Sequence, residues 1–111
     1  MAEMTTYERA AQIYQVLICA AHNRQTMTYP MLGELVGLPP WGLGNPLDHI
    51  QVYCQENDLP PLTGLVVRTG EGQPASGFDS PEDMDRARES VFDHEWFKMR
   101  PITPELLGEG R

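Results

Sequence analysis

The first segment with a clear hydrophobic period lies near the N-terminus. Thr5 stands three residues before Glu8, which is the spacing of a capping box, so a helix is expected to begin there. Apolar side chains then recur at helical spacing, at Tyr7, Ala10, Ile13, Tyr14, Leu17 and Ala21. This pattern predicts an amphipathic helix with one face in the core.

Two shorter helices are predicted next, on either side of a connection rich in Pro and Gly. Thr28 and Pro30 open a helix through about Val36, ended by Gly37, and the residues predicted to face inward are Met31, Leu32 and Leu35. After "GLPPWGLGN", Asn45 is placed to cap a third helix, with Pro46 and Asp48 in its first turn and an apolar face of Leu47, Ile50, Tyr53 and Cys54. This order of elements predicts a helix-turn-helix arrangement.

A hairpin and an acidic helix are predicted in the second half. "LVVRT", residues 65–69, has the composition of a strand, "GEGQ" that of a turn, and "PASGF", residues 74–78, that of either an edge strand or a loose return. A fourth helix is expected from Ser80, with acidic faces and an apolar side of Met84, Ala87, Val91 and Phe92. The apolar residues of the tail are expected to pack on the domain: Trp96, Phe97, Met99, Ile102, Leu106 and Leu107.

Together these elements predict one domain over residues 1–111, mainly α-helical with a small β-hairpin, and winged-helix-like. Its expected parts are a core at 7–78, an acidic helix at 80–97 and a tail at 98–111. A chain of 111 residues can bury one core without disulfides or metal. Because no apolar run approaches the roughly 20 residues of a membrane helix and the N-terminus lacks signal-peptide features, a cytoplasmic location is expected.

The charge distribution narrows the choice of partners. The formal net charge is −8, and residues 79–95 carry seven acidic side chains against Arg86 and Arg88, a local charge of −5. The first 78 residues hold only Arg9, Arg24 and Arg68 as fixed cations. Since Lys and Arg supply most non-specific affinity for nucleic acid, weak DNA binding is expected. The charge favours a basic protein partner, or none.

Few residues offer catalytic or metal chemistry. Cys54 and His49 are five residues apart on one predicted helix, which does not bring their side chains together, and both Cys54 and Cys19 are expected to be buried free thiols. The three histidines lack the compact spacing of a zinc site. "GLGN" and "GEGQ" lack a P-loop lysine and are interpreted as turns. We therefore expect no catalytic residue, no metal and no cofactor, with a hydrolase or transferase using Cys54 as the least favoured alternative.

Four segments in order also resemble a known family. "TMTYPMLGELVGLP", "WGLGNPL", "LPPLTGLVV" and "GQPASGF" are similar to motifs of the DNA-binding domain of O6-alkylguanine-DNA alkyltransferases and alkyltransferase-like proteins, over about residues 7–78. Tyr29 falls where that family has the tyrosine that helps to rotate a DNA phosphate, although Pro30 replaces the following glycine. Trp41 falls near the position of the arginine that enters the base stack. The resemblance implies a winged-helix-like scaffold.

The resemblance does not extend to the family's chemistry. Pro61 or Leu62 falls where the reactive cysteine would stand, and Thr63 or Gly64 takes the place of its basic neighbours. No thiol in this segment can accept an alkyl group. The sequence therefore implies a scaffold without transferase activity.

Two functional hypotheses remain. The first is a non-catalytic intracellular protein that docks a protein partner through Trp41 and Tyr29, and binds a basic partner through Glu82, Asp83, Asp85 and Glu89. An acidic protein of this kind can inhibit a nucleic-acid-binding protein by presenting carboxylates where phosphates would lie. The second is direct binding of DNA or a modified base, as the resemblance implies, through Tyr29, Trp41 and Arg68.

The tryptophans leave two alternatives open. Trp41, between proline and glycine on a connection, is either an exposed binding anchor or a clamp folded over the core. Trp96 with Phe97 presents the same choice, and Trp96 is kept as a candidate binding residue. Exposure of both clusters on one side would indicate a hydrophobic partner surface.

Overall fold

The computed structural model describes residues 3–68 and 81–110 of the chain. Its helices are α1 (Thr6–His22), α2 (Tyr29–Val36), α3 (Gly44–Glu56) and α4 (Pro81–Asp93), and its strands are β1 (Met27–Thr28) and β2 (Val66–Val67). Three short 3-10 turns join them, namely η1 (Pro40–Gly42), η2 (Leu62–Leu65) and η3 (Trp96–Lys98). The described chain is therefore mainly helical with a small two-stranded sheet.

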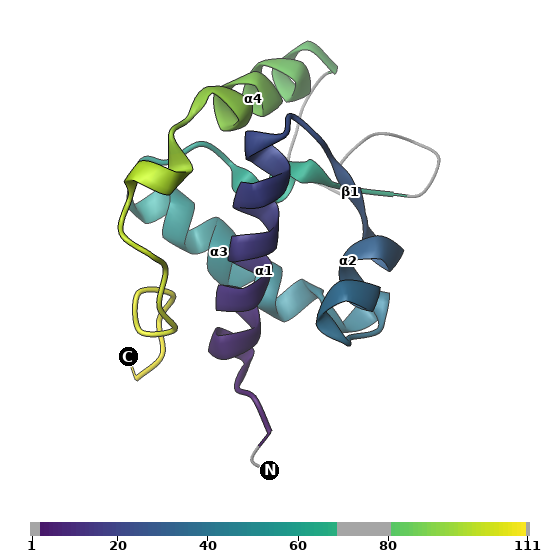
Figure 1. Ribbon diagram of the computed structural model, residues 1–111, viewed down its shortest axis with the longest axis vertical. Coiled ribbons are helices and arrows are strands. Elements are labelled where there is room, and N and C mark those ends of the chain that lie inside the picture. The colour runs from purple at the N-terminus through teal and green to yellow at the C-terminus, as the bar shows by residue number, and fades with distance from the viewer. Residues whose placement is uncertain (1–2, 69–80, 111) are drawn as a thin grey trace.

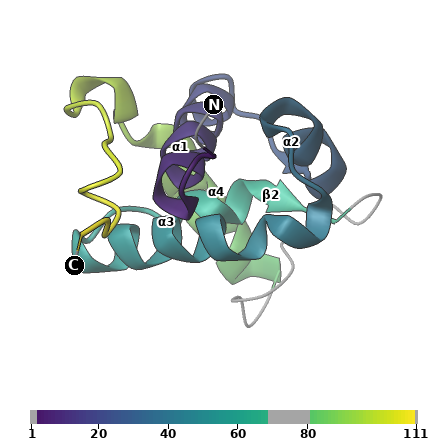
Figure 2. The same ribbon diagram turned by 90° about the horizontal axis from the view of Figure 1, so that it is seen from below.

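α1 is the central helix of the core. It begins as predicted, because the Thr5 hydroxyl accepts a hydrogen bond from the Glu8 backbone N–H and the Glu8 carboxylate accepts one from the Thr5 N–H. In Figure 2, α1 lies between α2 and the C-terminal segment, and α3 runs beneath it. Five of the six residues expected on the apolar face are buried, namely Ala10, Ile13, Tyr14, Leu17 and Ala21, while Tyr7 is partly buried; Ile18 and Ala20 are buried in addition.

Of the three residues predicted to face inward on α2, only Leu32 is buried. Leu32 and Val36 are buried, but Met31 is 52% exposed and Leu35 is 65% exposed. The Thr28 hydroxyl caps the helix, as predicted, by accepting a hydrogen bond from the Met31 N–H at 3.2 Å. In so short a helix, either of two adjacent apolar stripes can face the core. The hydrophobic period alone therefore placed Met31 and Leu35 in the core, and this was wrong.

α3 begins one residue before the predicted cap. Leu43 occupies the N-cap position and offers no side-chain cap, while its own N–H donates to the Pro40 carbonyl at 3.2 Å. Asn45 is therefore an exposed residue inside the first turn and not the cap. The buried face agrees with the predicted one at Leu47, Ile50 and Cys54, and Tyr53 is half-buried with its ring edge-on to Tyr14.

The described sheet is parallel, with Met27 opposite Val66 and Thr28 opposite Val67. The strand predicted at residues 65–69 is shorter, since Leu65 belongs to η2 and Val67 ends the strand. The predicted turn at 70–73 and return strand at 74–78 lie outside the described residues, as does the Ser80 cap. The parallel register has one consequence for the surface, because it places Tyr29 and Arg68 just beyond the same end of the sheet.

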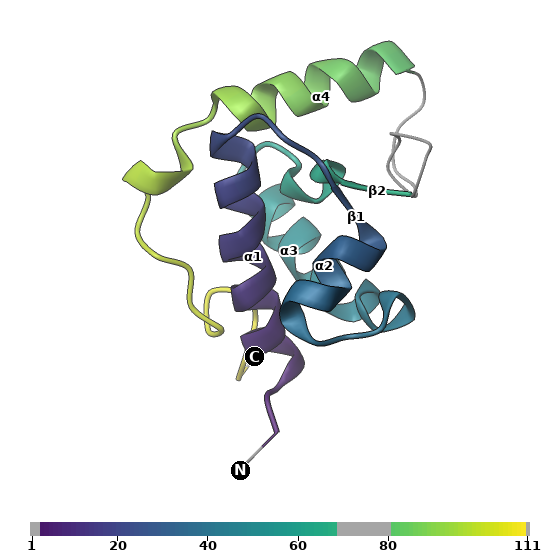
Figure 3. The same cartoon turned by 45° about the vertical axis from the view of Figure 1, so that its right-hand side comes forward.

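α4 crosses the C-terminal end of α1 (Figure 1, Figure 3). Met84 and Val91 are buried there, as expected, while Ala87 and Phe92 are partly buried. Within residues 3–68 and 81–110, no helix combines the length and hydrophobicity that a membrane crossing requires.

The tail packs on the domain, in agreement with the prediction. Trp96, Ile102 and Leu107 belong to the same buried cluster as α1 and α3. The chain then returns toward its start, where the Thr5 hydroxyl donates to the Glu109 carboxylate at 2.8 Å. Phe97 and Leu106 are exceptions, since both side chains are largely exposed.

Candidate functional site

The most exposed large apolar side chain among the described residues is Trp41, at 87%. It lies in η1, where the Gly42 N–H donates to the Pro39 carbonyl at 2.8 Å and the Leu43 N–H donates to the Pro40 carbonyl. Leu43 is fully buried and anchors the end of this turn. Trp41 is thus an exposed side chain on a hydrogen-bonded turn and is not folded over the core as a clamp.

The turn is also fixed to α2. The Leu38 N–H donates to the Gly33 carbonyl at 2.9 Å, and a Cβ atom at Gly33 would overlap the Leu38 carbonyl oxygen. Pro39 and Pro40 restrict the backbone of the turn further. The indole is therefore presented by a backbone with little freedom to lose on binding. α2 adds two more exposed apolar side chains, Met31 and Leu35.

Tyr29 and Arg68 come together, as the second hypothesis requires. Burial raises the pKa of the half-buried Tyr29, the neighbouring positive charge of Arg68 lowers it, and the negative charge of Asp48 on α3 raises it. This small polar cluster lies beyond the end of the two-stranded sheet. It supplies one cation and one carboxylate, and so has little net attraction for a phosphate.

The exposed face of α3 bears on the DNA-binding hypothesis, because α3 is the second helix of the predicted helix-turn-helix. Its exposed side chains contain no lysine or arginine: Asn45, Asp48, Gln51, Val52, Gln55 and Glu56. A helix that enters a groove between phosphates normally carries cations or is flanked by them. The only formal charges on this helix are negative.

The four acidic residues proposed on α4 are all exposed: Glu82, Asp83, Asp85 and Glu89. Asp83 contacts Arg86 at 2.7 Å, and Glu89 contacts Arg24 of the loop after α1 at 2.5 Å. These ion pairs are exposed and contribute little to stability. With Asp93, which also contacts Arg24, α4 carries five exposed carboxylates against two cations of its own, Arg86 and Arg88.

Trp96, unlike Trp41, is buried. It is only 4% exposed, its indole N–H donates to the Val91 carbonyl at 2.8 Å, and its ring is edge-on to Tyr14. Trp96 therefore packs α4 onto α1 and offers no surface for a partner in this arrangement. The exposed aromatic of this segment is Phe97, at 59%. The two tryptophans do not form the common exposed surface that the sequence left open.

The thiols also differ from one another. Cys54 is buried as predicted, and burial raises its pKa to about 11, although the Leu62 backbone N–H donates to its sulfur and acts in the opposite direction. Such a thiol is a poor nucleophile at neutral pH. His49 stacks on Tyr7, with ring centroids 4.4 Å apart. The prediction of a buried Cys19 is wrong, because this thiol is exposed at a position where α1 faces away from the core.

Of Pro61 and Leu62, the two residues that the resemblance would set in place of a reactive cysteine, Leu62 is fully buried in η2 and Pro61 is half-buried. Within residues 3–68 and 81–110, no three His, Cys, Asp or Glu side chains gather closely enough to hold a metal ion.

One cavity was missed by sequence reasoning. It has a volume of about 280 Å³ and lies where α4 ends, lined by His22, Phe92, Asp93, His94, Glu95, Trp96, Phe97 and Lys98. The sequence contains one signal for this cavity. Phe92 and Phe97 flank the predicted end of the acidic helix, with Asp93 and Glu95 between them.

In comparisons with protein-family models, curated proteins and solved structures, nothing matches this chain. Its function must therefore be argued from its own surfaces and charges.

Proposed function

We propose that this protein is a non-catalytic binding protein that docks a protein partner through Trp41. The observation that carries the proposal is the 87% exposure of Trp41 on a turn fixed by hydrogen bonds and prolines. Tryptophan is among the residues that most often dominate binding energy at protein interfaces. A side chain held in place before binding loses less conformational entropy on association. Tyr29 and the exposed side chains of α2 extend the apolar area.

The charge of the chain points to a basic partner. The net charge is −8, and exposed carboxylates are concentrated on α4. A field of this sign speeds association with a cationic protein and repels nucleic acid. An inhibitor of a nucleic-acid-binding protein, with carboxylates where phosphates would lie, fits this charge. In this role the protein acts in the cytoplasm, where its partner works.

The alternative is an alkyltransferase-like protein that binds DNA or a modified base without transferring a group. The order of elements supports it, because α2, η1 and α3 follow one another as the helices and turn of a helix-turn-helix do. The proximity of Tyr29 and Arg68 favours it as well. The absence of a cation from the described α3 weighs against it, and for this reason we place protein docking first.

The docking proposal is tested with partners recovered from the native host and then purified. Trp41→Ala is expected to weaken the affinity of such a partner at least about tenfold, a hot-spot effect. Val52→Ala, which trims an exposed apolar side chain on α3, is the control and should change the affinity less than about twofold. Equal affinities for the wild type and Trp41→Ala would overturn docking through Trp41.

The acidic surface needs its own variant. Glu82→Gln with Asp85→Asn removes two carboxylates from α4, and Glu34→Gln with Asp58→Asn removes two exposed carboxylates elsewhere. If α4 faces the partner, the first pair slows association at low salt and the second does so much less. Equal effects of both pairs would show that only net charge matters.

Direct nucleic-acid binding is tested by titrating labelled duplexes, one plain and one containing an alkylated guanine, at low salt. The docking proposal expects no saturable binding. Micromolar binding that weakens steeply as salt is added, and that Arg68→Gln reduces, would establish the alternative instead.

A further inference from the structure

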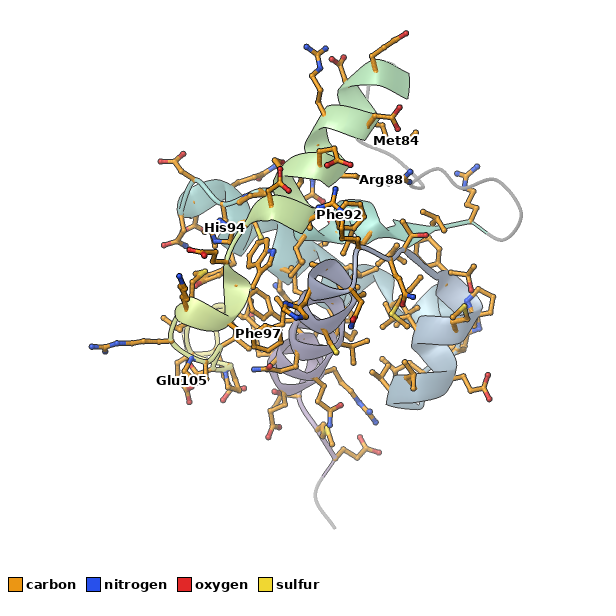
Figure 4. All side chains as sticks on the ribbon, turned by 45° about the horizontal axis from the view of Figure 1, so that its top comes forward. Met84, Arg88, Phe92, His94, Phe97 and Glu105 are labelled. Carbon is orange, nitrogen blue, oxygen red and sulfur yellow. The ribbon has the colours of Figure 1, made fainter. Side chains whose placement is uncertain are left out.

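The cavity where α4 ends is formed by two parts of the chain that are distant in sequence, His22 and the continuous stretch 92–98. His22 comes from the last turn of α1, Phe92 from the end of α4, and Phe97 from η3. In Figure 4, Phe92, His94 and Phe97 follow one another along the end of α4 and the segment beyond it, while Met84 and Arg88 lie nearer the start of the helix. Its volume of about 280 Å³ suits one long side chain better than a drug-sized ligand.

Aromatic rings form much of its lining. Phe97 is 59% exposed and makes an edge contact with His22, with centroids 5.8 Å apart. The buried Trp96 makes an edge contact with the His94 ring, with ring centroids 4.4 Å apart. The face of an aromatic ring attracts a cation electrostatically, most strongly where water is partly excluded.

The charges around the cavity have the complementary sign. Asp93 and Glu95 line it, with Lys98 as the one fixed cation in the lining. The C-terminal ends of α1 and α4 both lie here, and each helix end carries a partial negative charge. Lys98 is bound to Glu95 at 2.9 Å in a pair whose side chains are largely exposed. An exposed pair of this kind is easily exchanged for another cation.

The protein already holds one guanidinium group beside this cavity. The Cζ atom of Arg24 lies 5.1 Å from the centre of the Phe92 ring, while its nitrogens contact Glu89 at 2.5 Å and Asp93 at 3.1 Å. One arginine therefore satisfies both the aromatic face and the carboxylates at the rim. Phe97 and Glu95 also line the cavity and offer the same combination of ring and carboxylate, and no arginine among the described residues belongs to the lining.

We propose that this cavity binds the guanidinium group of an arginine side chain on a basic protein partner. The inference rests on the proposed docking function and specifies the chemistry of its partner. Arginine fits better than lysine, because a planar guanidinium stacks on a ring and bonds a carboxylate through two N–H groups at once. In the complex it lies against Phe97, bonds Glu95 and displaces Lys98.

The test uses the full chain and two small probes that differ only in charge. Nα-acetyl-arginine amide and its citrulline counterpart are titrated at pH 8 and low salt, with backbone amide NMR signals recorded. The arginine probe is expected to shift signals of His22 and of residues 92–98, with an affinity about tenfold above that of the neutral probe. Equal affinities, or shifts centred elsewhere, would refute the proposal.

Variants separate the proposed contacts from a general charge effect. Phe97→Ala and Glu95→Gln should each weaken the arginine probe at least about threefold, whereas Lys98→Met, which removes the internal competitor, should strengthen it by a similar factor. Glu34→Gln on α2 removes the same charge as Glu95→Gln at a distant exposed site and should have little effect. Phe97 and Glu95 are exposed, so neither change threatens folding. An unchanged affinity in Lys98→Met would count against the site.

The two proposals fail separately. A purified partner that loses affinity for Trp41→Ala but not for Phe97→Ala or Glu95→Gln would leave docking intact and remove the arginine site. Specific binding of the arginine probe, with a partner unaffected by Trp41→Ala, would retain the cavity and overturn docking through Trp41.

Discussion

The carbonyl oxygen of Leu38 lies directly over the α-carbon of Gly33, in the space that a side chain would occupy. The same two residues are joined by the Leu38 N–H, which donates to the Gly33 carbonyl at 2.9 Å. The backbone on the way to η1 therefore rests on the backbone of α2 with no side chain between. The position of Trp41 depends on this close approach.

Replacing Gly33 by Ala tests that dependence. Ala has the higher helix propensity by about 1 kcal/mol, but its Cβ would overlap the Leu38 carbonyl and force the backbones apart. We expect a net loss of about 1–3 kcal/mol in the free energy of unfolding, measured by urea titration. Gly44→Ala in the first turn of α3 is the matched control, because no atom lies within 4 Å of a Cβ there. Its stability should be unchanged or slightly higher, and similar losses in both variants would contradict the packing described.

The two tryptophans should differ sharply in their contribution to stability. Trp96→Ala removes a buried ring and leaves the Val91 carbonyl without its indole partner, so a loss of about 3–5 kcal/mol is expected. Trp41→Ala removes an exposed ring and should change the free energy of unfolding by less than about 0.5 kcal/mol. Urea unfolding of the two variants measures both. A large loss in Trp41→Ala would mean that the indole folds over the core after all.

Sequence patterns predicted the long elements better than the short ones. α1 is long enough for its hydrophobic period to be unambiguous, and its capping box is a local contact between Thr5 and Glu8, three residues apart. The packing of the tail was also predictable from composition, because burial of apolar side chains such as Trp96, Ile102 and Leu107 is favourable. In α2, two adjacent stripes were equally apolar, and tertiary contacts made the choice.

The candidate site was predicted only in part, for related physical reasons. Tyr29 and Arg68 were grouped through a family resemblance, whereas the structure brings them together by pairing β1 with β2 in parallel, a long-range contact that local patterns do not encode. The exposure of Trp41 depends on the backbone contact at Gly33 and could not be read from "PPWG". The cavity at the end of α4 requires His22 and Phe97 to meet, and they are far apart in sequence.

The phase of α2 gives a third prediction. Leu35→Gln should cost less than about 0.5 kcal/mol because the side chain already faces water, whereas Leu32→Ala should cost about 2–5 kcal/mol through loss of a fully buried side chain. Thermal and urea unfolding of both variants provide the measurement. Comparable losses would restore the face predicted from the sequence period. If Leu35 contacts the partner, Leu35→Gln also weakens docking while leaving stability intact.

Alkaline pH should destabilise the fold through Cys54. Burial raises its pKa from 9.0 to about 11, so between these values the unfolded chain loses a proton that the folded chain keeps. The stabilising effect of the buried neutral thiol is thus complete below about pH 9 and is lost as the pH rises toward 11, at about 1 kcal/mol per pH unit.

Urea unfolding at pH 8, 9 and 10 measures this slope for the wild type and two variants. Cys54→Ala should lower stability at pH 8 by creating a cavity but should flatten the decline from pH 9 to pH 10. Burial also raises the pKa of Tyr14, so a residual decline is expected above pH 10 in every variant. Cys19→Ser should retain the wild-type slope, because this thiol is exposed. A slope unchanged by Cys54→Ala would place the alkaline sensitivity in other groups and contradict the role assigned to the buried thiol.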